Sequence, residues 1–128
     1  MTTLSVHPDE LEAERSDQSE NRTAELGEYT VDFGTIRAGL IMNAATFKGL
    51  PDDACQCPHW GLLLKGEWGV PMSDGTELTI RAGEAYYLPP GHRFEVVTDS
   101  EYVEFSPTED LQKTYAVVAA NQAASTDH

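Results

Sequence analysis

The chain has 128 residues, the length of one ordinary domain. It carries 22 Asp and Glu against 8 Lys and Arg, an acidic balance that repels phosphate backbones and anionic lipid, so we expect no nucleic acid and no membrane as partner. No apolar run approaches the roughly 20 residues that span a bilayer, and the N-terminus lacks the basic and apolar parts of a signal peptide. We therefore expect a cytoplasmic protein.

The first 27 residues are rich in Asp, Glu, Ser, Gln and Asn and hold few apolar side chains. Such a segment buries too little apolar surface to offset the entropy lost on ordering. The sequence therefore predicts a disordered acidic leader over residues 1–27 and a single domain over residues 28–122. Residues 123–128 are expected to be a frayed tail.

From residue 29 the pattern changes to alternation, with Tyr29, Val31 and Phe33 separated by Thr, Asp and Gly. This period of two predicts a strand. Further strands are predicted, between Gly, Pro and Asp-Gly turns, at residues 40–47, 60–65, 67–72, 77–81, 85–88, 93–98 and 102–105. The last two are expected to pair across a turn at Asp99 and Ser100. Many short strands at regular spacing indicate an all-β sandwich or barrel.

The C-terminal segment has a different pattern. Ser106 reads as an N-cap, Pro107 as the first helical residue and Glu109 as the acid that completes a capping box. Four apolar residues then fall on one helical face, namely Leu111, Tyr115, Val118 and Ala119. We expect one C-terminal helix packed on the outside of a sheet.

Potential metal ligands gather at two places in the sequence. Cys55, Cys57 and His59 occupy alternate positions, and His92 follows a Pro-Pro-Gly turn. Two cysteines one residue apart are not the disulfide framework of a secreted domain. Residues on one face of an ideal strand lie about 6.6 Å apart, too far for three of them to hold one ion. A bulge at Pro58 would draw Cys57 and His59 together, with His92 arriving from a facing strand.

Residues 40–105 resemble a cupin. Gly83, Pro89 and Gly91 match the spacing of the second cupin motif, and Gly66 matches the glycine that closes the first. The resemblance implies an all-β, cupin-type double-stranded β-helix (jelly-roll) barrel with one C-terminal α-helix. It also implies a small-molecule ligand inside the barrel and a homodimer formed through the sheets, for which an exposed strand at residues 29–33 would be suitable.

The ligand positions depart from the usual cupin set of three His and one Glu. The first-motif positions are occupied by Asp53, Cys55 and His59, and the second-motif His position by Phe94. His92 precedes Phe94 by two residues and can share its strand face. The resemblance therefore keeps the location of a metal site but changes its chemistry.

The sequence predicts a divalent metal ion held by Cys55, Cys57, His59 and His92, with Asp53 as a further candidate by register. Two thiolates and two imidazoles suit tetrahedral zinc. Thiolate also favours copper, and an open set with fewer thiolates can hold iron or nickel. In the alternative interpretation the two cysteines are small buried hydrophobes and the histidines are ordinary hydrogen-bonded side chains.

The candidate pocket-lining residues are Tyr87, Phe94, Trp68 and Glu104. Aromatic side chains also fill cores and dimer interfaces, and Glu104 can instead belong to a solvated strand face. Tyr86 and Tyr87 are neighbours, so only one of them faces inward. The sequence assigns no catalytic residue.

These features predict a metal-binding, single-domain cupin. One hypothesis is a small-molecule enzyme of the isomerase, decarboxylase or dioxygenase type, in which the metal polarises a carbonyl or activates water or oxygen. A second is a non-catalytic binding or sensing module with a closed metal site. A third is a cupin that binds its ligand without metal.

Overall fold

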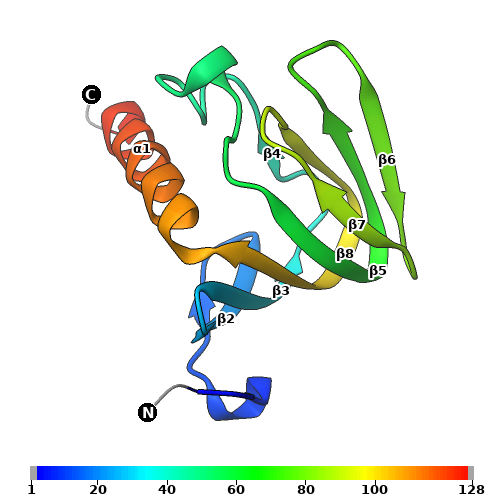
Figure 1. Cartoon of the computed structure of the whole chain (residues 1–128). Coiled ribbons are helices and arrows are strands. Elements are labelled where there is room, and N and C mark those ends of the chain that lie inside the picture. Colours follow the sequence, from blue (N-terminus) through cyan, green and yellow to red (C-terminus); the bar gives the residue numbers. More distant parts are fainter. Residues whose placement is uncertain (1–2, 127–128) are drawn as a thin grey trace.

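The computed structural model describes residues 3–126 and is organised around two long strands, β5 (His59–Pro71) and β8 (Phe94–Pro107). They pair antiparallel and belong to a sheet of eight strands (Figure 1). The other elements are the 3-10 turns η1 (Pro8–Glu10) and η2 (Pro51–Asp53), strands β1 (Glu14–Arg15), β2 (Ser19–Leu26), β3 (Tyr29–Ile36), β4 (Ile41–Met42), β6 (Glu77–Arg81) and β7 (Ala85–Leu88), and helix α1 (Thr108–Thr126).

The two long strands divide the sheet into two parts. The start of β5 and the end of β8 pair with β7 and β3, and β2 pairs with β3; we call this part the β3 half-sheet. The end of β5 and the start of β8 pair with β6 and β4, and we call this part the β6 half-sheet.

The two half-sheets meet where the β5–β8 pairing changes register, between Leu63 and Trp68. Gly66 lies in this stretch with a φ of 102°, a conformation that side chains other than glycine rarely adopt. A Cβ atom at Gly66 would also collide with Ser100 and with the carbonyl oxygen of Asp99. This irregularity bends both long strands, because bulges increase local twist.

The main apolar core lies between the half-sheets and is centred on Trp68. Its ring makes edge-on contacts with Tyr86, Phe94 and Tyr102 at centroid distances of 5.2, 4.7 and 5.2 Å. Edge-to-face packing at this range is a favourable aromatic geometry. Around the ring lie the other buried apolar residues of the cluster, Ile36, Leu63, Val70, Ile80, Leu88 and Val96.

Helix α1 does not lie on the outside of the sheet as the sequence suggested. Its Val118 is buried with Phe47, Cys55 and Cys57, and Asn121 Nδ2 donates to the carbonyl oxygens of Thr46 and Lys48. The helix therefore packs on the segment between β4 and β5 (Figure 1). Within residues 3–126, no helix combines the length and the apolar character needed to cross a membrane.

The boundaries of α1 also differ from the prediction. Ser106 and Pro107 end β8 instead of starting the helix, because the Ser106 hydroxyl is already hydrogen-bonded to His59. At the other end, α1 continues to Thr126, through most of the segment expected to fray, and residues 127–128 lie outside the described residues.

The disorder expected over residues 1–27 does not hold for β2, which pairs with β3 along all eight of its residues. Backbone hydrogen bonds to a neighbouring strand order the segment without an apolar face. The Arg22 guanidinium adds hydrogen bonds to the carbonyl oxygens of Pro8 and Leu11. The composition of residues 1–27 was misleading because it reflects only the gain from apolar burial and not the gain from pairing with β3.

Two further expectations are corrected. The strand predicted at residues 40–47 shrinks to β4, because Asn43 Oδ1 accepts from the backbone of Ala45 and Thr46 and forms a turn. The turn predicted at Asp99 and Ser100 is absent, since β8 runs through both residues. Val96 before this point and Tyr102 and Ser106 after it are all buried even-numbered residues, so one strand fits where two were expected.

Candidate metal centre and ligand cavity

A short backbone pairing brings the two ligand-bearing stretches together. Cys55 N–H donates to the His92 carbonyl at 2.9 Å, and Gly91 N–H donates to the Cys55 carbonyl at 2.7 Å. His59 opens β5 and lies opposite Leu88, the last residue of β7. The turn after β7 therefore delivers His92 beside both Cys55 and His59, as the sequence predicted.

Cys55, His59 and His92 form a group that can hold a metal ion. Their ligand atoms all lie within 4.8 Å of one another, and all three residues are buried. Cys55 Sγ is 3.8 Å from His59 Nε2, and the two imidazole centroids are 5.0 Å apart. Zinc bonds of about 2.0–2.3 Å place tetrahedral ligand atoms roughly 3.3–3.8 Å apart, so the distance between Cys55 Sγ and His59 Nε2 suits an ion of this size.

Each histidine is oriented by a hydrogen bond from its other ring nitrogen. His92 Nδ1 donates to the Pro89 carbonyl, which can only accept, at 2.7 Å. His59 Nδ1 lies 2.6 Å from Ser106 Oγ and 3.6 Å from Glu104 Oε2. These contacts favour the Nδ1–H tautomer on both rings and leave the Nε2 lone pairs for an ion. Such outer partners are typical of metal-binding histidines.

Burial sets the charge state of the three residues. It lowers the pKa of His59 and of His92 to about 4, and the neighbouring His59 adds to the effect on His92. Both imidazoles are therefore neutral at pH 7 and able to bind a cation. Burial raises the pKa of the Cys55 thiol to about 11, so without a cation it stays protonated. A metal ion at this position would displace that proton.

Cys57 lies outside this group. Its Sγ is 4.0 Å from His59 Nδ1, the ring nitrogen that faces away from Cys55, and 3.5 Å from the Pro58 carbonyl. Cys57 is fully buried and packs with Phe47 and Val118. Burial raises the pKa of its thiol to about 12. The structure thus places one of the two cysteines with the histidines and the other in a small apolar core.

A cavity of about 360 Å³ opens beside the three residues. Three of the predicted pocket-lining residues, Trp68, Phe94 and Glu104, do line it. Tyr87 does not: it lies on the outer face of the sheet, half exposed, and stacks on Trp60 at 5.2 Å. Of the two neighbouring tyrosines, the one that faces inward is Tyr86, which is buried.

The fold of the chain has counterparts among solved structures. No family model matches the chain, and no curated protein does. Solved structures do match. An RmlC-like cupin from Shewanella frigidimarina is 16% identical with a TM-score of 0.57, over 80% of this chain and 88% of that one. Ectoine synthase from P. lautus is 16% identical with a TM-score of 0.58, over 82% of this chain and 78% of that one.

A third match is oxalate decarboxylase from Bacillus subtilis, 12% identical with a TM-score of 0.60. It covers 84% of this chain but only 30% of the decarboxylase. The protein has the cupin fold. At these identities the likeness concerns the fold alone.

Two of the usual cupin ligand positions are unsuitable in this cupin. Asp53 is exposed, and its Oδ1 accepts from the Gly49 backbone instead of facing the cavity. Phe94 packs edge-on against Trp68. His92 provides the second-motif imidazole from the turn before β8, which explains why it lies two residues earlier than the motif predicts.

Sequence reasoning missed a polar network on the inner face of the β3 half-sheet. Asp32 accepts from Asn21 Nδ2 at 3.1 and 3.0 Å and from the Tyr102 hydroxyl at 2.9 Å. On the adjacent strand β8, directly opposite Asp32, Glu104 accepts from the Tyr86 hydroxyl at 2.9 Å. Asp32 was overlooked because the alternation in β3 shows which residues share a face but not which face is inside. In this strand the polar residues face inward.

Two glycines make room for this network. A Cβ atom at Gly34 would collide with the Tyr102 ring, and one at Gly61 with the Tyr86 ring and the Val103 carbonyl. Each phenol can therefore lie flat across a neighbouring strand and direct its hydroxyl at a carboxyl group. Glycines inside predicted strands, Gly34 and Gly61, are the signal in the sequence that could have indicated close packing here.

Burial keeps both acids partly protonated near neutral pH. It raises the pKa of Asp32 to about 6, an effect that hydrogen bonds from Asn21 and Tyr102 oppose. It raises the pKa of Glu104 to about 7, against the hydrogen bond from Tyr86. A carboxyl group that changes protonation near pH 7 can donate or accept a proton at that pH.

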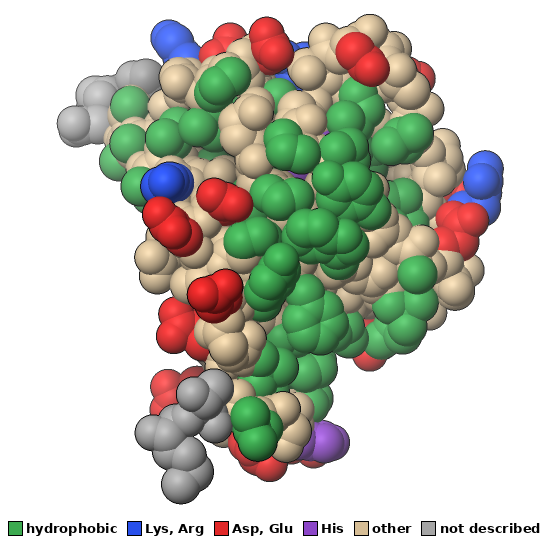
Figure 2. All heavy atoms as spheres, viewed as in Figure 1, with side chains coloured by type: hydrophobic (Ala, Val, Ile, Leu, Met, Phe, Trp, Pro, Cys, Tyr) green, Lys and Arg blue, Asp and Glu red, His purple; other side chains and the backbone are tan. Residues whose placement is uncertain are grey.

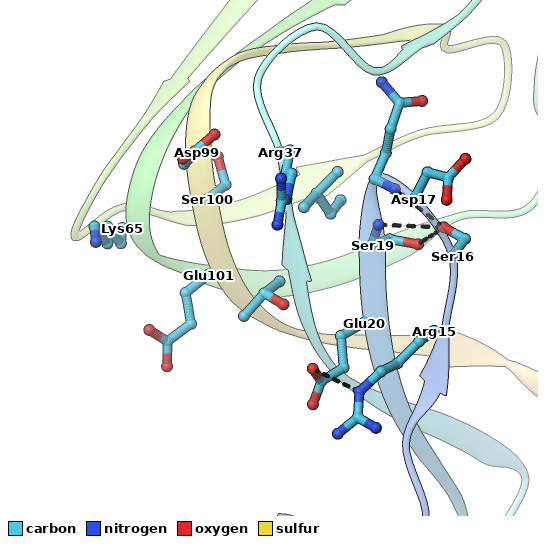
Figure 3. A pocket seen from close by; sticks show the side chains of 13 residues that line it. Arg15, Ser16, Asp17, Ser19, Glu20, Arg37, Lys65, Asp99, Ser100 and Glu101 are labelled. Atoms are coloured by element: carbon cyan, nitrogen blue, oxygen red, sulfur yellow. Dashed lines mark hydrogen bonds and ion pairs between the residues drawn. The ribbon is translucent and has the colours of Figure 1, made fainter.

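A second hollow, also about 360 Å³, lies on the surface between the β1–β2 turn, the end of β3 and the middle of β8 (Figure 3). Its charged side chains are of both signs and lie at the surface. Arg15 Nε pairs with Glu20 at 3.2 Å, and Ser16 is hydrogen-bonded to Ser19 at 2.9 Å. These groups satisfy one another, and the hollow shares none of the buried ligand-type residues of the first cavity.

Proposed function

We propose that this cupin binds one divalent metal ion through Cys55 Sγ, His59 Nε2 and His92 Nε2, and that the ion serves small-molecule chemistry in the adjoining cavity. The observation that carries the proposal is the convergence of three buried ligand atoms within 4.8 Å beside a cavity of about 360 Å³. Three protein ligands with a remaining free position are the pattern of catalytic metal sites.

Zinc is the proposed ion, because one thiolate and two neutral imidazoles are its common ligands. Iron, nickel and copper are accepted by similar sets. When bound, such an ion acts as a Lewis acid that polarises a carbonyl or lowers the pKa of a water molecule. Isomerisation, decarboxylation and dioxygenation are the reaction classes that we consider, and two of the matched cupins, the synthase and the decarboxylase, are enzymes by name.

The enzyme hypothesis is favoured over a sensing or structural module by the position of Cys57. If Cys57 completed a four-ligand set, the site would be closed and non-catalytic. Its Sγ instead lies against the ring nitrogen of His59 that points away from Cys55. The second candidate, a non-catalytic metal- or ligand-binding module, applies if the cavity binds its ligand without converting it.

Metal analysis of the full chain, purified without added metal, tests the proposal. We expect about one equivalent of metal in the wild type and in His7→Ala, a histidine at the surface. Replacing both His59 and His92 with alanine should remove the metal. Cys55→Ser should lower its content and Cys57→Ser should not, although both cysteines are buried. Metal retained by the double histidine variant would refute the assignment.

We further propose that two copies pair through the outer face of the β3 half-sheet. Five large apolar side chains there are 38–50% exposed, namely Tyr29, Trp60, Leu62, Tyr87 and Phe105. Figure 2 shows hydrophobic side chains gathered along the middle of this view. Exposed apolar patches mark interaction sites. Two chains that each carry a net charge of −14 can meet without strong repulsion only on an uncharged face such as this one.

The strand at residues 29–33 is not an exposed edge through which two sheets could pair, because β3 is paired on both sides, with β2 and β8. Sedimentation analysis tests it. We expect a dimer for the wild type and a monomer for Trp60→Glu. Leu78→Glu, at a half-exposed apolar position of β6, should remain a dimer. A wild-type monomer would contradict the proposal. A cytoplasmic location stays a prediction from the sequence.

A further inference from the structure

The cavity contains two acidic side chains directly opposite each other. Asp32 of β3 and Glu104 of β8 are Cα partners in the antiparallel pairing, and both line the cavity. Directly opposed residues have Cβ atoms about 4.5–5.5 Å apart, and like charges in this arrangement destabilise a sheet. Because Glu104 also contacts His59 at 3.6 Å, it belongs to the metal end of the cavity, and Asp32 is the acid farther from it.

The described lining of the cavity provides no cationic side chain to balance these acids. Among the described residues that line the cavity there is no Lys and no Arg. The groups that hold Asp32 are neutral donors, the amide of Asn21 and the hydroxyl of Tyr102. They fix the orientation of the carboxyl group but leave its charge unpaired. Buried charges are usually paired, so a positively charged partner from outside the chain would complete the site.

The rest of the cavity wall suits the same partner. Trp68, Phe94 and Tyr102 form one cluster of packed rings at the cavity, and aromatic faces attract cations. Trp68 is only 1% exposed and its indole nitrogen is buried, so Phe94, the partly exposed ring of the three, is the one that a ligand can reach.

We propose that the ligand of this cavity is a small amine whose ammonium group pairs with the Asp32 carboxylate. The inference rests on the proposed function in one respect, that the cavity beside the metal site takes a small molecule. It adds the chemical class of that molecule. It also excludes a negatively charged group at the Asp32 end of the cavity, because that group would face an acid and no base.

Two matched four-carbon compounds test the proposal: aminobutanol and butanediol, each with its two functional groups at opposite ends. Binding to the metal-loaded full chain is measured by calorimetry or ligand-observed NMR. We expect aminobutanol to bind at least about tenfold more tightly than butanediol, since a charge-assisted contact replaces a neutral one. Equal binding of the two compounds, or preference for the diol, would overturn the proposal in the wild type alone.

Asp32→Asn should abolish the preference for aminobutanol over butanediol, whereas Glu25→Gln, an exposed acid of β2, should keep it. An unchanged preference in Asp32→Asn would also overturn the proposal. Metal content, measured on the same samples, separates the two hypotheses. Selective amine binding by a chain without metal would refute the metal centre alone. A metal-loaded chain that does not prefer the amine would refute the amine ligand alone.

Discussion

The two half-sheets share the strands β5 and β8, yet they bury different kinds of residue. In the β6 half-sheet the inner side chains are apolar, as Trp68, Val70 and Val96 show, and the outer ones include Glu95 and Arg81. In the β3 half-sheet the inner positions also hold polar or ionisable groups, among them His59, Asp32, Tyr86, Glu104 and Ser106, beside apolar ones such as Leu88, and the outer face carries large exposed apolar side chains.

The difference indicates that the two half-sheets have different roles. The β6 half-sheet follows the ordinary rule that apolar side chains are buried, so it can stabilise the barrel. The β3 half-sheet buries hydrogen-bonded polar groups that cost free energy to desolvate. Proteins retain such groups chiefly where they bind or react. We therefore place the metal centre and the ligand cavity in the β3 half-sheet.

The largest expected effect comes from adding one methyl group in each half of β5. Gly61→Ala would force the new Cβ against the Tyr86 ring and the Val103 carbonyl, and we expect a loss of about 3 kcal/mol in the free energy of unfolding. Gly69→Ala is the matched control, since its nearest neighbour would be Glu95 Oε2 at 3.7 Å. Urea unfolding measures both. Equal losses would show that the close packing is not specific to the β3 half-sheet.

The second prediction concerns pH. Burial raises the pKa of Asp32 from 3.8 to about 6, so the folded state binds this proton more tightly than the unfolded state. Its contribution to stability is greatest below pH 4 and is lost as the pH rises to about 6, by about 2–3 kcal/mol. Asp32→Asn lacks this proton. The unfolding free energy of the wild type minus that of the variant should fall by this amount between pH 4 and pH 7, and a constant difference would contradict the account.

The smallest effect should distinguish two neighbouring tyrosines of β7. Tyr86→Phe removes the hydroxyl that donates to Glu104 and leaves a buried acid without this partner, so we expect a loss of about 1.5 kcal/mol in the free energy of unfolding. Tyr87→Phe removes a hydroxyl from the exposed face and should change it by less than about 0.5 kcal/mol. If thermal or urea unfolding showed the opposite order, the inward orientation of Tyr86 would be wrong.

Much of the fold was predictable because its signals are local. Glycine and proline at the turns located β6 and β7, although the two strands predicted at residues 60–65 and 67–72 form the single strand β5. The motif spacing around Gly83, Pro89 and Gly91 indicated the barrel. The convergence of Cys55, His59 and His92 followed from the same spacing. Turn residues fix where a chain reverses, and in a small barrel that nearly fixes which strands become neighbours.

The predictions that failed needed information that the alternation of apolar and polar residues does not contain. A period of two shows which residues share a face, but not which face is inside. For this reason Asp32 was overlooked and Tyr87 was preferred to Tyr86. The polar strand β2 was missed because its order comes from backbone pairing with β3. Cys57 was included as a ligand because the direction of a thiol depends on the bend at Pro58, which only the structure provides.

X-ray absorption at the edge of the metal that copurifies with the full chain tests the central claim most directly. The account predicts one sulfur at about 2.3 Å and two imidazole nitrogens at about 2.0–2.1 Å, with the sulfur lost in Cys55→Ser and kept in Cys57→Ser. A first shell with two sulfurs, or with none, would contradict a metal held by Cys55, His59 and His92.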